Sequence, residues 1–244
     1  MMFSEISIGN WLTDSHLIMT ALLAGFALVH SGLAAWRSRG EQWLGARGYR
    51  LLFAAVSIPF AVLLIVYFIN HRYDGAQLWQ LQDIGGIRPL VWILSAISFV
   101  FLYPATFNLL EIAAVQKPQV YLYETGIIRI CRHPQMVGQI IWCVAHTLWL
   151  GSSFAVVTSL GLIAHHLFGV WHGDRRWQQR YPEAFPALKA RTSIVPFLAI
   201  WQGRQTLKLE EFLRPAYLGV VLFVWLLAWG HPYLIQGSAW LGWR

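Results

Sequence analysis

Charged side chains are scarce in this chain. Of its 244 residues, only 12% are Asp, Glu, Lys or Arg, whereas 57% are hydrophobic. A soluble domain carries roughly a quarter charged residues, so the composition favours an integral membrane protein over a large soluble core. The formal net charge of +7 does not indicate a nucleic-acid partner. The basic residues stand in short blocks between apolar runs, as loop anchors of membrane proteins do.

Cysteine is rare, and several sequence signatures are missing. Two cysteines in apolar helical sequence, Cys131 and Cys143, do not make a disulfide framework. The first fifteen residues have no basic region and include Glu5 and Asp14, which argues against a signal or transit peptide. The chain also has no GxGxxG nucleotide-binding sequence and no CxxCH haem-attachment sequence. The absence of a leader sequence favours a bacterial-type membrane protein. The absence of CxxCH means that any haem would be held non-covalently.

Long apolar runs predict an all-α protein, a polytopic transmembrane helix bundle of about six spans. About 20 apolar residues are needed to cross the hydrocarbon core. The six runs, all within one integral-membrane domain of residues 1–244, are 16–36, 51–69, 89–114, 136–150, 154–171 and 215–230. The fourth run is short, and the turn 151–153 joins it to the fifth. The apolar piece 194–201 is too short to cross and is expected at the interface.

The basic residues predict the orientation of these spans. Positive charge is concentrated after the first, third and fifth runs, while the turn after the fourth carries none. Basic loops face the cytoplasm, so we expect both termini on the opposite side. The predicted location is the plasma or thylakoid membrane of a cyanobacterium or another bacterium, with membrane lipid as the surrounding partner.

Ionisable residues inside apolar runs indicate candidate sites, because they are costly there. His30 lies in the first run, and Cys143 and His146 lie three residues apart in the fourth, on one helix face. Taken singly, each histidine is most simply explained by a hydrogen bond to nearby backbone. Together, histidines from two helices and a thiol are ligands that can hold a haem iron. Zinc fits less well, since it wants four ligands.

Other polar residues keep two interpretations. Arg132 and His133 precede a proline that can start a helix. They are either interfacial cations or a polar pocket for an acidic group such as a haem propionate. His165 and His166 are adjacent and point in different directions, so only one of them can face the bundle. His71 lies in a polar loop, where solvation is the simpler interpretation.

Four stretches form a specific combination: HSGLAAWR from His30, ETGIIRICRHPQMVGQIIWCVAHTLWLG, GLIAHHLFGVWHGDRRWQQRYPEAFPALKARTSIVPF, and QGRQ at 202–205. Together they resemble the 15-cis-zeta-carotene isomerases among the NnrU-like membrane proteins. The resemblance implies an isomerase that uses a redox-regulated haem b. It would convert the 15-cis bond of 9,15,9'-tri-cis-zeta-carotene to trans, giving 9,9'-di-cis-zeta-carotene. By that similarity, His30 and His146 match the axial, catalytic histidines. Cys143 matches the residue proposed to replace one histidine when the iron is oxidised.

The same resemblance implies partners. The substrate, zeta-carotene, is a hydrocarbon without a polar group, so it is expected to arrive from the lipid bilayer. Phytoene and zeta-carotene desaturases, which act before and after this step, are expected neighbours.

Two other functions stay open. The segments GIIRICRHPQMVG and YPEAFPALKARTSIVPF also resemble RHP-containing membrane methyltransferases that use S-adenosylmethionine. NnrU-type relatives linked to denitrification suggest a haem protein that handles nitric oxide. Methyl transfer does not need paired intramembrane histidines, which favours the isomerase.

Overall fold

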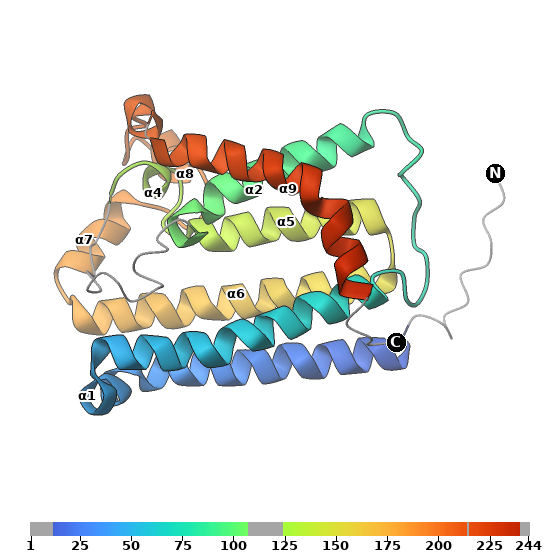
Figure 1. Ribbon diagram of the computed structural model, residues 1–244. Helices are drawn as coiled ribbons and strands as arrows, with labels where there is room; N and C mark the ends of the chain where they lie inside the picture. The colour runs from blue at the N-terminus through green and yellow to red at the C-terminus, as the bar shows by residue number, and fades with distance from the viewer. Residues whose placement is uncertain (1–11, 107–123, 214, 240–244) are drawn as a thin grey trace.

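The computed structural model describes residues 12–106, 124–213 and 215–239, and these are predominantly helical (Figure 1). The elements are α1 (Asp14–His71), α2 (Ile87–Thr106), α4 (Ile127–Ile130), α5 (Pro134–Leu150), α6 (Ser153–Arg180), α7 (Ala184–Arg191), α8 (Leu198–Trp201), η2 (Leu209–Phe212) and α9 (Pro215–Ala239). Apart from one isolated β-bridge, Gln77 to Ser152, these residues contain no strand pairing. The all-α class predicted from the sequence is confirmed.

α1 is a helical hairpin whose two arms lie side by side (Figure 1). The reversal occurs at Gly45, whose φ of 70° and ψ of 162° fall in a region that a residue with a Cβ rarely adopts. The hydroxyl of Tyr49 donates a hydrogen bond to the carbonyl of Leu33 and ties the arms together beside the turn. The loop expected between the first two apolar runs is therefore helical except at Gly45. Good helix formers and the Arg37–Glu41 ion pair favour that outcome.

Three described helices are long and apolar enough to cross a membrane: α1, α6 and the Tyr217–Ala239 part of α9. The prediction of six separate spans is thus not confirmed. The first two runs are the arms of one helix, the apolar part of α2 is the shorter Ile87–Leu102, and α5 has 17 residues. Positions 107–114 of the third run lie outside the described residues. Within those residues, all six apolar runs are helical.

The helices pack in a consistent order, with α6 between the α1 hairpin and α5, α2 on α5, and α9 on α2 (Figure 1). α2 and α5 approach closely at Gly138, where an added Cβ would lie 2.7 Å from the carbonyl oxygen of Ser98. The Ser98 hydroxyl donates to the Gly138 carbonyl at 2.7 Å. Two apolar clusters flank this contact region, one around Cys131 and Met136, the other around Met19 and Phe154.

The turn between α5 and α6 is built as the sequence indicated. Gly151 has a left-handed φ of 64° and ends α5, and the Ser152 hydroxyl caps α6 by accepting from the amide of Ala155 at 3.1 Å. Ser153 then binds His16 Nε2 through its hydroxyl at 3.1 Å. This contact fixes the start of α1 against the start of α6, and it gives a common level from which positions along both helices can be counted.

Candidate functional site

His30 lies in the first arm of α1 within an aromatic cage. Its ring stacks on Phe26, with centroids 5.0 Å apart, and meets the edge of Phe53 at 4.8 Å. Its Nδ1 hydrogen-bonds the hydroxyl of Ser57, on the other arm, at 3.2 Å. The bond to Ser57 orients the ring; where Nδ1 donates to the hydroxyl, Nε2 keeps the lone pair with which His30 can bind a ligand.

The ring nearest to His30 from another helix is that of His165. The two centroids are 6.0 Å apart, and His165 also contacts Phe26 at 5.5 Å. The Nδ1 atom of His165 is buried and has no hydrogen-bond partner. A buried polar atom without a protein partner is costly, and a bound ligand, an ordered water or a functional role accounts for such an atom. His166, the next residue, contacts His165 at 5.8 Å.

His146 lies on α5 with its ring stacked on Trp142 at a centroid distance of 3.8 Å. Its Nδ1 is 2.9 Å from the Trp142 carbonyl oxygen. Because a carbonyl only accepts, Nδ1 carries the proton, and Nε2 keeps the lone pair that a metal requires. Histidines that bind metals are commonly oriented in this way through their second nitrogen.

Among the described residues no contact joins His30 to His146. Counted from the His16–Ser153 contact, His30 lies about 21 Å along α1, and His146 lies about 10 Å back along α5. Their Cα atoms are therefore offset by roughly 10 Å along the bundle. Side chains lean toward the N-terminus of their helix, and these two helices run in opposite directions, so the two rings lean toward each other. Each ring does lie over the residue four positions earlier.

Cys143 is 1% exposed and lies on the α5 face that contacts α6. The amide nitrogen of Gln139 lies 3.5 Å from its sulfur. The thiol borders a groove of about 300 Å³ lined by apolar atoms of both helices. Beside it, the hydroxyls of Thr147 and Ser159 form a hydrogen bond of 2.7 Å between α5 and α6.

The cations at the start of α5 are occupied by a carboxylate of the protein. Asp174 on α6 accepts from Arg132 Nη2 at 3.0 Å and lies 2.7 Å from His133 Nε2. Thr192 binds a second nitrogen of Arg132 at 3.3 Å, while the buried Nε has no partner. This arrangement favours a structural role, in which Asp174 pins α5 to α6, over the pocket for a cofactor's acidic group.

Two further histidines make structural contacts at the end of the bundle near the α5–α6 turn. His71, expected in a solvated loop, ends α1 and pairs through Nδ1 with Asp74 at 2.8 Å. His16 is 1% exposed and links Thr13 to Ser153. Both are satisfied by neighbours, so neither is a ligand candidate.

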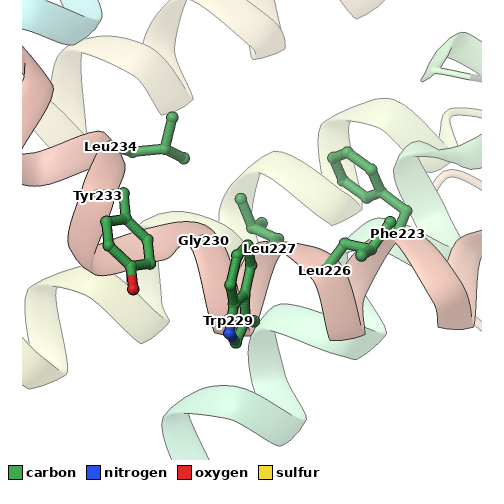
Figure 2. A pocket seen from close by; sticks show the side chains of 7 residues that line it. All are labelled: Phe223, Leu226, Leu227, Trp229, Gly230, Tyr233 and Leu234. Atoms are coloured by element: carbon green, nitrogen blue, oxygen red, sulfur yellow. The ribbon is translucent and has the colours of Figure 1, made fainter.

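A second apolar hollow, of about 550 Å³, lies along α9 near the bend at Pro232 (Figure 2). Aromatic and aliphatic side chains line it, including Phe223, Trp229 and Leu234, with the Tyr233 hydroxyl at one side. It contains no group that can donate to a metal as imidazole does. We therefore place the candidate site at the histidines of α1, α5 and α6.

These histidines suit a haem better than a bare metal ion. No group of three or more His, Cys, Asp or Glu in the described part of the chain has the geometry of a metal centre. A haem iron needs only one or two protein ligands, because the porphyrin supplies four. His30 and His146 each have Nδ1 in a hydrogen bond that orients the ring, and each ring stacks on an aromatic neighbour. The donor set therefore fits haem ligation.

The fold and site define an all-α protein with apolar helices of membrane-spanning length and with histidines facing one another inside the bundle. The NnrU protein family model matches residues 18–239, and the chain belongs to that family. It is 57% identical over 235 residues to a chloroplastic 15-cis-zeta-carotene isomerase of Zea mays, covering 95% of this chain. It is 53% identical over 236 residues, 96% of this chain, to the enzyme of that name from Arabidopsis thaliana.

The chain spans 64% of the length of each of these two relatives. Both are chloroplastic plant proteins, so the similarity does not support the expectation of an exclusively bacterial protein. No solved structure matches the chain. The apolar helices agree with the expected association with a membrane.

The sequence alone missed the partners of the site residues. Ser57, which orients His30, and Asp174, which binds both Arg132 and His133, carry no motif of their own. His165 was visible as a histidine inside an apolar run, but the sequence could not tell which neighbour its ring meets.

Proposed function

We propose that this chain is a cis–trans isomerase of carotenoid biosynthesis that converts the 15-cis bond of 9,15,9'-tri-cis-zeta-carotene to trans. The observation that carries the proposal is the identity of 57% over 95% of the chain to a 15-cis-zeta-carotene isomerase. A match this long includes the candidate site, since His30, Cys143, His146 and His165 all lie inside the family match. The enzymes that make and consume the same hydrocarbon, desaturases by reaction class, are its expected neighbours in the membrane.

We further propose that haem b is the cofactor and that the imidazoles of His30 and His146 would hold its iron. The hydrogen bonds at both Nδ1 atoms support this, because they orient each ring through one nitrogen, as metal-binding histidines commonly are. Cys143, one turn before His146, is the proposed ligand of the oxidised iron, and its burial beside the groove keeps its sulfur away from water. A bound haem iron would donate electron density to the polyene and so lower the bond order of the central double bond.

The groove between α5 and α6 is the proposed approach for the substrate. It is apolar, Cys143 is among its lining residues, and it lies along α5 and α6, two of the three helices that bear the site. Removing apolar surface from water is favourable by a free energy of about 25 cal/mol per Å². A hydrocarbon that moves from lipid into such a groove gains little of this free energy, because it has already left water. Shape, rather than hydrophobicity, is therefore expected to select the substrate.

We propose that all six apolar segments cross the membrane, with the basic loops on the cytoplasmic side or its organellar equivalent. Each arm of α1 supports this, because its helical rise of about 1.5 Å per residue over more than 20 residues exceeds a core about 30 Å thick.

The test of the proposed function is expression in cells that accumulate 9,15,9'-tri-cis-zeta-carotene, grown in darkness because light also isomerises the bond. We expect the 9,9'-di-cis isomer to appear with the wild-type chain and not with an empty vector. Unchanged pigment, with the protein present in the membrane, would refute the isomerase. The purified protein also separates the alternatives: a Soret band favours a haem protein, and binding of S-adenosylmethionine without a Soret band favours the methyltransferase.

A further inference from the structure

His165 has two features that the proposed pair of ligands does not explain. Its ring lies 6.0 Å from that of His30, on a different helix, and its Nδ1 is buried without a partner. Buried polar atoms are otherwise well satisfied among the described residues, where only one other side-chain atom, Nε of Arg132, shares this condition. The imidazole is therefore held at a cost in a position that faces the imidazole of His30.

The spacing of the two rings is that of imidazoles that share one metal. Two imidazoles bound on opposite sides of one metal, through nitrogens about 2 Å from it, have ring centres roughly 6 Å apart. The observed separation of the ring centres, 6.0 Å, agrees with this distance, and the two rings meet in a T-shaped contact with their planes inclined by 70°. His30 is already oriented by Ser57, so one partner of the pair is fixed in advance.

The helix register agrees with that pairing. From the His16–Ser153 contact, His30 follows fourteen residues along α1 and His165 twelve residues along α6, which places them at about 21 and 18 Å. His146 lies roughly 10 Å nearer to the contact. Of the two imidazoles available to His30, that of His165 is at its own level, whereas that of His146 must reach along the bundle.

We propose that His165 is an alternative imidazole ligand, which would hold the haem iron together with His30 when His146 does not. This inference rests on the proposed haem of the preceding section. In this exchange the bond from the iron to the neutral imidazole of His146 would break, and a bond to the neutral imidazole of His165 would form. The exchange therefore moves no electron and no proton. It would give the site three imidazoles for two axial positions, so that one position opposite His30 can change its ligand without loss of the cofactor.

The test compares four purified full-length proteins supplied with haem: wild type, His146→Ala, His146→Ala/His165→Ala and His146→Ala/His166→Ala. His166 is the matched control, since it is the next residue on the same helix and equally half-buried. The readouts are haem per chain and the sharp visible bands of low-spin ferrous haem. Both are measured after reduction with dithionite, where the Cys143 sulfur is not the proposed ligand.

We expect His146→Ala and His146→Ala/His166→Ala to keep haem with low-spin bands. His146→Ala/His165→Ala should bind haem at least tenfold more weakly and lose those bands, and added imidazole should restore them. If the two double variants behave alike, or if the His165 variant keeps its low-spin bands, the inference is wrong while the proposed function stands. If the wild type itself takes up no haem, the proposed cofactor and this inference fall together.

Discussion

Two regions of this molecule treat polar side chains in opposite ways. At the end formed by α4, α7, α8 and η2, Arg129 donates to both oxygens of Glu211 at 2.8 and 2.9 Å and to Gln205 at 2.8 Å. In the bundle interior, by contrast, the polar groups include imidazoles packed against aromatic rings, and that of His165 has a nitrogen with no partner. In the first region two carboxylates are paired with arginines, whereas in the second the imidazoles hydrogen-bond a hydroxyl and a carbonyl, which carry no charge.

The contrast separates holding the fold from holding a ligand. A charge pair that satisfies itself stabilises two segments against each other and has no capacity left for a ligand. An interior histidine oriented through Nδ1 has a second nitrogen available, and its burial makes a ligand there more favourable. Substitutions at the charged end should therefore change thermal stability, whereas substitutions of the interior histidines should change the spectrum of the cofactor.

The largest effect is expected for His30→Ala. Because His30 is the imidazole common to both proposed ligand pairs, its loss should remove the low-spin haem and lower isomerase activity by more than 100-fold. The melting temperature in detergent, measured without haem, should change little. Haem content and dark isomerisation are the measurements, with His166→Ala as control. Full haem in the His30 variant would break the assignment of the interior region.

A large effect on stability alone is expected for Arg129→Ala. The side chains of Arg129 and Glu211 are each 12% exposed, so the change leaves a mostly buried carboxylate unpaired and should cost about 2–4 kcal/mol. Arg191→Ala is the matched control, because Arg191 pairs with Glu124 but is 52% exposed, so its loss should destabilise the fold much less. Thermal unfolding of the two variants measures the difference. Equal losses would contradict the distinction between a buried and an exposed pair.

A smaller, spectroscopic effect is expected for Ser57→Ala. The hydroxyl of Ser57 orients His30 through Nδ1 at 3.2 Å, and loss of such a support typically weakens metal binding by about 10–100-fold. Haem titration measures this, and Ser57→Thr, which keeps the hydroxyl, should restore most of the affinity. An unchanged dissociation constant in Ser57→Ala would show that the ring is held by Phe26 and Phe53 alone.

The smallest expected effect is a loss of thermal stability at low pH. Hydrogen bonds from Arg129 lower the pKa of the Glu211 carboxyl from 4.5 to about 2. A carboxylate with a lower pKa in the folded state stabilises the fold above its unfolded pKa, and this contribution is lost as the pH falls toward the folded one. The melting temperature should therefore drop between pH 4.5 and 2, and it should drop less in Glu211→Gln. If the melting temperatures of the two proteins fall equally with pH, Glu211 does not contribute to the loss of stability in acid.

The sequence was enough for the helical class and for the turn at Gly151, because apolar runs and a glycine followed by serines are local signals. It was not enough for the hairpin of α1, since the stretch around Gly45 reads as a basic loop although its residues favour helix. Spacing placed Cys143 and His146 on one helix face. It could not place His165 beside His30, because contacts between helices depend on tertiary packing.

The most direct test of the central claim uses the purified protein loaded with haem, placed in lipid vesicles with 9,15,9'-tri-cis-zeta-carotene and kept in darkness. Chromatography of the extracted pigment follows the central bond. We expect the dithionite-reduced protein to produce 9,9'-di-cis-zeta-carotene and the oxidised protein to produce little or none. A folded, fully haem-loaded and reduced protein that leaves the substrate unchanged would contradict the account.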